Sequence, residues 1–188
     1  MPVTGLTRRV FCRRTVSLPP VTLSAPEALL AVDLGVRTGL ALYRRDGRLV
    51  WYRSANFGSA ARLKKAIPAL LVPNPFTVIH LVIEGGGPLA ELWTHAAERR
   101  YIDCHRIDAL TWRRQLLLPR EHRDRTRLKL IAERLARQVI VWSEAPRPTS
   151  LRHDAAEAIL IGLWGVRQVG WLDILPVGGQ GSRVRSVR

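Results

Sequence analysis

Short apolar runs, each closed by glycine or by a charged residue, alternate along the chain with segments in which apolar residues recur every three or four positions. Runs of the first kind predict buried β-strands, and the three-to-four spacing predicts α-helices. We expect strands at 29–34, 38–43, 48–53, 76–84 and 101–107. The Asp46-Gly47 pair between the second and third runs is typical of a hairpin turn, so the first three strands should be antiparallel.

Helices are expected at 59–71, at 88–100, around Trp112, at 128–142 and at 151–165, with loops at 119–127 and 146–150. Ser59 is a suitable N-cap for the first helix, and the prolines at 73 and 75 would end it. This order of elements predicts one α/β domain with a mixed five-stranded sheet flanked by helices. The two cysteines, Cys12 and Cys104, lie in segments of different character and suggest neither a disulfide framework nor a cysteine zinc site.

The segment 151–165, LRHDAAEAILIGLWG, carries two carboxylates at the start of a helix that is otherwise apolar. Asp154 and Glu157 are three residues apart, which places both on one face of the helix. An unpaired carboxylate in apolar surroundings is strongly disfavoured, so these two side chains require a compensating cation or a set of hydrogen-bond donors.

Two further acids interrupt apolar strands: Asp33 in the first strand and Glu84 at the end of the fourth. A lone acid after a strand is commonly a turn or cap residue, but these acids come from three separate segments. If the first and fourth strands are neighbours, all four carboxylates can converge, and such a cluster repels itself unless it binds divalent cations. Hard oxygen ligands favour Mg²⁺ or Mn²⁺. Two such ions about 4 Å apart stabilise the attacking and leaving oxygens of a phosphodiester displacement.

The charge of the chain indicates a polyanionic partner. Lys and Arg number 30 against 15 acids, for a net charge of +15, and the basic residues recur along the whole chain. Nucleic acid is the expected partner, although a basic surface that only aids solubility is the alternative. The candidate phosphate contacts are Arg113, Arg114, Arg120, Arg123, Arg125, Arg127, Lys129, Arg147 and Arg152, together with the backbone of Gly85 and Gly86. The competing interpretation is that these residues only form a solvated surface.

The ends of the chain differ from its body. Residues 1–28 form a basic extension that we expect to be disordered and that could be an organelle transit peptide, and residues 170–188 read as a basic tail. No apolar run reaches the roughly 18 residues of a membrane span, so no membrane partner is expected.

Three motifs give the body of the chain a family resemblance. AVDLGVRTGLALY around Asp33, VIEGGG around Glu84, and RHDAAEAILIGLWG around Asp154 and Glu157 resemble, in order and spacing, the RuvC Holliday-junction resolvases, in particular their bacterial and plastid branch. The resemblance covers residues 29–169 and implies a ribonuclease H-like (RNase H-like) fold. It further implies a homodimeric endodeoxyribonuclease of the bacterial cytoplasm and nucleoid, which nicks two strands of a four-way junction. The four acids would hold two Mg²⁺ ions, with water as the nucleophile.

Two positions depart from or add to the family pattern. Members carry an aromatic residue shortly after the glutamate, whereas the third residue after Glu84 is Gly87. Trp93 is the nearest substitute, although a core position explains it more simply. His153, next to Asp154, is a candidate base or ligand. The remaining histidines, at 80, 95, 105 and 122, are expected to be structural or surface residues.

Three other functions remain open. An RNA-processing nuclease of the same superfamily, the YqgF type, also begins with an Asp-Leu-Gly strand, but Glu84 and the Asp-Ala-Ala-Glu helix follow the RuvC arrangement. An actin-like or sugar-kinase ATP-binding domain would need a second phosphate loop, for which this length leaves no room. A branched-DNA-binding module without catalysis has no physical reason to keep four mutually repelling acids.

Overall fold

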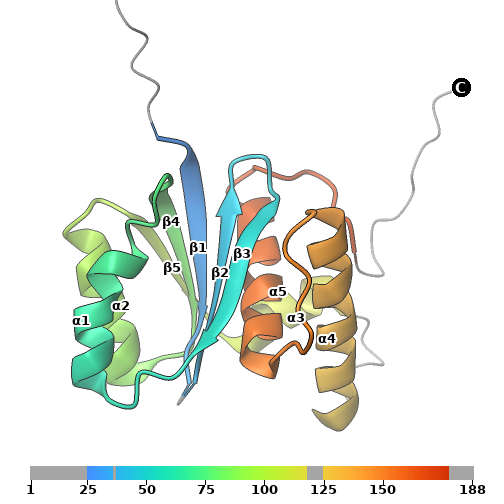
Figure 1. Ribbon diagram of the computed structural model, residues 1–188, viewed down its shortest axis with the longest axis horizontal. Coiled ribbons are helices and arrows are strands. Elements are labelled where there is room, and N and C mark those ends of the chain that lie inside the picture. Colours follow the sequence, from blue (N-terminus) through green and yellow to red (C-terminus); the bar gives the residue numbers. More distant parts are fainter. Residues whose placement is uncertain (1–24, 36, 118–124, 178–188) are drawn as a thin grey trace, which may run out of the picture.

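The computed structural model describes residues 25–35, 37–117 and 125–177 (Figure 1). Its five strands are β1 Glu27–Asp33, β2 Thr38–Arg44, β3 Leu49–Ala55, β4 Thr77–Glu84 and β5 Asp103–Ile107. Its helices are α1 Ala60–Leu70, α2 Gly87–Glu98, α3 Ala109–Leu116, α4 Arg125–Trp142 and α5 His153–Gln168.

The strands form one mixed sheet in the order β3-β2-β1-β4-β5. The pairs β1–β2 and β2–β3 are antiparallel, and the pairs β1–β4 and β4–β5 are parallel. The expected mixed five-stranded sheet flanked by helices is therefore confirmed. The first and fourth strands are direct neighbours, which is the arrangement that convergence of the four acids requires.

Local sequence signals account for the ends of several elements. Gly47 adopts a positive φ of 78° in the turn between β2 and β3, as the Asp-Gly pair predicts. The side chain of Ser59 accepts a hydrogen bond from the backbone N–H of Arg62 and caps α1, as expected. Helix α4 begins at Arg125, so the prediction of a loop through residue 127 is wrong at its C-terminal end. Residues 118–124 of that loop lie outside the described residues.

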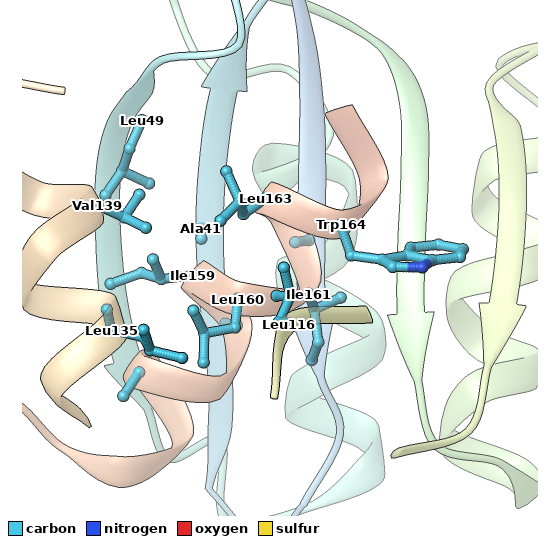
Figure 2. Close-up of a cluster of buried hydrophobic side chains, with 14 of the residues drawn as sticks. Ala41, Leu49, Leu116, Leu135, Val139, Ile159, Leu160, Ile161, Leu163 and Trp164 are labelled. Carbon is cyan, nitrogen blue, oxygen red and sulfur yellow. The ribbon is translucent and has the colours of Figure 1, made fainter. Parts of the chain in front are cut away.

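The sheet divides the apolar core into two layers (Figure 1). Helices α1 and α2 cover one face, where Trp93 is fully buried among Leu30, Leu81 and Ile83. Helices α3, α4 and α5 cover the other face (Figure 2), where α5 packs its apolar residues on β1 and β2. The core interpretation of Trp93 is therefore confirmed, since a fully buried indole cannot insert into a DNA junction.

The folded domain extends past both predicted boundaries. Ala28, assigned to the N-terminal extension, is fully buried within β1. After α5, Trp171, Leu172 and Leu175 pack against the core, and Val177 is only 6% exposed. The tail predicted to begin at residue 170 thus contributes apolar surface to the domain through Val177. In the described ranges, no helix is both long and apolar enough to cross a membrane.

Candidate functional site

Asp33 and Glu84 lie side by side at the carboxyl ends of two neighbouring parallel strands. They are register partners in the β1–β4 pair, and the backbone N–H of Leu34 donates to the carbonyl oxygen of Glu84 at 3.0 Å. Because side chains alternate along a strand, Asp33 points to the same face as Ala31, and Glu84 to the same face as Val82. Both Ala31 and Val82 belong to the core layer beneath α5, so the two carboxylates face that helix.

Gly39 allows α5 to bring its two acids to the same end of the sheet. It is the register partner of Asp33 in β2, and a Cβ atom at this position would overlap with the backbone carbonyl oxygen of Asp154. The first turn of α5 therefore rests directly on the β2 backbone beside Asp33. Asp154 is half-buried in this turn and Glu157, one turn later, is 9% exposed.

The four carboxylates form one electrostatic cluster. Burial, followed by the negative charges of Glu157, Glu84 and Asp154, raises the pKa of Asp33 to about 8, and the positive charge of Arg113 opposes this rise. Burial is also the main cause that raises the pKa of Glu84; Glu157 adds to it, and a hydrogen bond from Trp112 opposes it. The other three acids therefore lie near enough to Asp33 to interact with it electrostatically.

Protein donors already contact three of these acids. The Trp112 indole N–H donates to Glu84, and the Ser54 hydroxyl donates to Asp154. A guanidinium N–H of Arg113 donates to Glu157 Oε1 at 2.6 Å, and His153 Nε2 lies 3.3 Å from Glu157 Oε2. Arg113, which was predicted to contact phosphate, is therefore paired with Glu157 of the cluster.

Ser54 and Trp112 were not anticipated as site residues. Ser54 is the register partner of Gly39, so its position depends on cross-strand register, which no local pattern encodes. Trp112 lies on α3 and is fully buried, and its spacing indicates only a core residue.

The carboxylates are close but not gathered as tightly as the ligands of a single ion. Among the described residues, the only group of three or more His, Cys, Asp or Glu side chains with donor atoms all within 4.8 Å of one another is His80, Asp103 and His105. Among the described residues, no three of the four acids therefore have ligand atoms all within 4.8 Å of one another.

A cleft of about 330 Å³ opens beside the cluster between α3, α4 and α5. Arg113, Leu128, Lys129, His153 and Glu157 line it, so two predicted phosphate contacts and the candidate base share one depression with an acid of the cluster.

The other predicted nucleic-acid contacts are exposed or lie outside the described residues. Arg114, Arg127, Lys129, Arg147 and Arg152 are exposed, and Arg152 is the N-cap residue of α5. Gly85 and Gly86 directly follow Glu84 and are exposed, with Gly85 at a φ of 119°. Arg120, Arg123 and the side chain of Arg125 lie outside the described residues.

Comparison with solved structures shows which known folds this chain resembles. A scan against protein-family models and a search of curated protein sequences found no match. A Thermus thermophilus RuvC structure aligns with a TM-score of 0.52 at 16% sequence identity, over 76% of this chain and 96% of that chain. T. thermophilus RuvC in complex with a Holliday junction substrate aligns with a TM-score of 0.50 at 15% identity, over 73% and 91%. At such identities the likeness concerns the fold, and the expected RNase H-like fold is confirmed.

Proposed function

We propose that this chain is a metal-dependent endonuclease that resolves four-way DNA junctions by paired nicks. The observation that carries the proposal is the convergence of Asp33, Glu84, Asp154 and Glu157, from three separate segments, at one end of a RuvC-like sheet. The fold likeness to a RuvC solved with a Holliday junction substrate supports branched DNA as the substrate. The net charge of +15 supports a nucleic-acid partner, whether DNA or RNA.

In donor type, the acids of the cluster suit a pair of Mg²⁺ ions, with Mn²⁺ as a substitute. All four donors are carboxylates, the hard oxygen ligands that these cations prefer. Burial is the main cause of the pKa of about 8 at Asp33, and the neighbouring carboxylates add to it more than the guanidinium of Arg113 offsets. Asp33, Glu84, Asp154 and Glu157 would hold the ions. When bound, they would stabilise the charge that develops on the attacking and leaving oxygens of the phosphodiester.

The remaining site residues have separate tasks in this proposal. Trp112 and Ser54 hold the Glu84 and Asp154 side chains in place through their hydrogen bonds. His153 is the candidate proton acceptor for the nucleophilic water, since it lines the cleft and its Nε2 lies 3.3 Å from Glu157 Oε2. The exposed residues Arg114, Arg127, Lys129, Arg147 and Arg152 would bind phosphates without reading sequence.

Paired nicks require two active sites on one junction. We therefore include a homodimer in the proposal, with one catalytic cluster in each protomer. Sedimentation of the purified protein, with and without a junction, measures its oligomeric state. A protein that stays monomeric on the junction yet introduces paired nicks would contradict it.

The proposal is tested with three labelled substrates: a four-way DNA junction, a linear duplex of the same sequence, and a structured RNA, each with Mg²⁺ and with chelator. Symmetric, Mg²⁺-dependent nicks confined to the junction are expected. Preferential cleavage of the RNA would instead identify an RNA-processing nuclease. Tight junction binding without any cleavage would identify a binding module.

Asp154→Asn separates catalysis from binding. Loss of one metal ligand should lower the cleavage rate by at least about a hundredfold, because even residues that only support metal ligands commonly contribute up to that much. Junction affinity should hold or rise, since one negative charge near the phosphates is removed. Asp173→Asn, an exposed acid after α5, is the matched control and should cleave normally. Loss of folding and binding together in Asp154→Asn would make Asp154 a structural residue.

A further inference from the structure

A second group of metal-type side chains lies on β4 and β5, away from the acidic cluster. His80 and Asp103 are register partners in the parallel β4–β5 pair, and His105 follows Asp103 by two residues, so all three side chains point to one face of the sheet. His80 precedes Glu84 by four residues on the same strand, a separation of about 13 Å at the usual rise per residue. The group is therefore distinct from the four acids.

The three side chains converge on one carboxylate oxygen. Asp103 Oδ2 lies 3.2 Å from His80 Nδ1 and 2.9 Å from His105 Nε2. One ligand atom from each of the three residues lies within 4.8 Å of the others. In a tetrahedral site with metal–ligand bonds of about 2.0–2.1 Å, neighbouring ligand atoms are about 3.3 Å apart. The two nitrogen–oxygen distances thus already approach the edge length of a zinc tetrahedron.

Surrounding contacts hold this group while leaving it open to solvent. The indole ring of Trp171 meets the His80 ring edge-on, with centroids 5.3 Å apart, and the His80 side chain is only 20% exposed. The side chains of His105 and Asp103 are 42% and 57% exposed. His80 therefore has a restrained ring, and a fourth ligand can approach from the side of Asp103 and His105.

We propose that His80, Asp103 and His105 form a metal site for a Zn²⁺-type ion, with three protein ligands and a fourth position open to water or another ligand. Two imidazoles and one carboxylate are typical of Zn²⁺ and disfavour Mg²⁺, which prefers oxygen ligands alone. A bound ion would join β4 to the edge strand β5. Through the Trp171–His80 contact, it would also fix the segment that follows α5. This site does not depend on the proposed nuclease activity.

The test uses Co²⁺ as a spectroscopic probe on the full-length chain, with Mg²⁺ in excess to occupy the carboxylate cluster. One equivalent of Co²⁺ should produce the visible absorption of a four-coordinate ion, and Zn²⁺ should displace it. His105→Gln should lower the affinity for Co²⁺ by at least about tenfold to a hundredfold, because the loss of a residue that only supports a ligand commonly has that effect, and Asp103→Asn should act in the same direction. His95→Gln is the matched control, because His95 is an exposed histidine on α2 whose ring contacts the backbone of Glu91.

Thermal unfolding gives a second measurement. Zn²⁺ should raise the midpoint temperature of unfolding of the wild-type protein and of the His95→Gln variant. It should raise the midpoint temperature of the His105→Gln variant much less. Because His105 is exposed, His105→Gln should fold, which far-ultraviolet circular dichroism checks. Co²⁺ affinity equal in His105→Gln and wild type would overturn the proposal, as would absence of a four-coordinate spectrum. Either result would leave three side chains joined only by hydrogen bonds.

Discussion

Gly39 sets how closely helix α5 approaches the sheet, and so it sets the position of two of the four acids. An alanine Cβ at this position would overlap with the carbonyl oxygen of Asp154. We predict that Gly39→Ala pushes the first turn of α5 away from β2. The change should lower the free energy of unfolding by about 1–3 kcal/mol, the usual cost of overpacking, and should slow cleavage of the junction.

Urea unfolding and a cleavage assay measure the two effects. Gly86→Ala is the control for unfolding, since its Cβ would meet only the Arg106 side chain at 3.7 Å. A Gly39→Ala protein with the stability and cleavage rate of wild type would show that the tight approach of α5 is not needed.

Asp33 should make the stability of the metal-free protein depend on pH. Its pKa is about 8 in the folded chain against a usual value of 3.8, so between these values the folded state holds a proton that the unfolded state has released. The free energy of unfolding should therefore fall as pH rises from about 4 to about 8, the opposite of the usual effect of a paired carboxylate. The raised pKa of Glu84 acts in the same direction.

Chelator-treated protein unfolded in urea across this pH range measures the effect. Asp33→Asn should remove most of the decline, whereas Asp173→Asn should keep it. Added Mg²⁺ should restore stability at the alkaline end, because bound cations compensate the ionised cluster. An identical decline in Asp33→Asn and wild type would place the titrating group elsewhere.

At the scale of elements, hydrophobic pattern predicted most of the fold, because each buried strand or helix has its own periodicity. Asp33, Glu84, Asp154 and Glu157 could be found for the same reason: each breaks an apolar element. The contacts of Ser54 with Asp154, and of His80 with Asp103, depend instead on which strands are neighbours and in what register. A single sequence does not contain that information locally, so these contacts had to come from the structure.

Helix α4 forms one wall of the cleft, and its N-terminal half should contribute to DNA binding. Lys129 lines the cleft with Arg113 and His153, whereas Arg137, two turns later, is hydrogen-bonded to Glu133 on the same helix. We predict that Lys129→Gln weakens junction binding and reduces the slope of log affinity against log salt by about one, as expected for the loss of a single phosphate contact.

Arg137→Gln is the matched control on α4 and should leave that slope unchanged. Fluorescence anisotropy at several salt concentrations measures both variants. Equal slopes for Lys129→Gln and wild type would remove α4 from the DNA-binding surface.

At the scale of the whole molecule, a strongly basic chain gathers four acids at one place. The net charge of +15 attracts a polyanion from any side, while the cluster of Asp33, Glu84, Asp154 and Glu157 repels a phosphate that comes close to it. Attraction and repulsion therefore act at different distances. Long-range binding should need no metal, whereas placing a phosphate at the cluster should require that its charge be neutralised.

This separation predicts different responses of binding and cleavage to chelator and to salt. Chelator should abolish cleavage while changing the affinity for a junction by less than about tenfold, since most phosphate contacts lie outside the cluster. Raising the salt from about 50 to about 200 mM should weaken binding by about a thousandfold or more if six or more phosphates are contacted. Anisotropy and cleavage assays on one junction measure both responses. Affinity that depends on metal as strongly as cleavage does would mean that the acidic cluster, rather than the basic surface, holds the DNA.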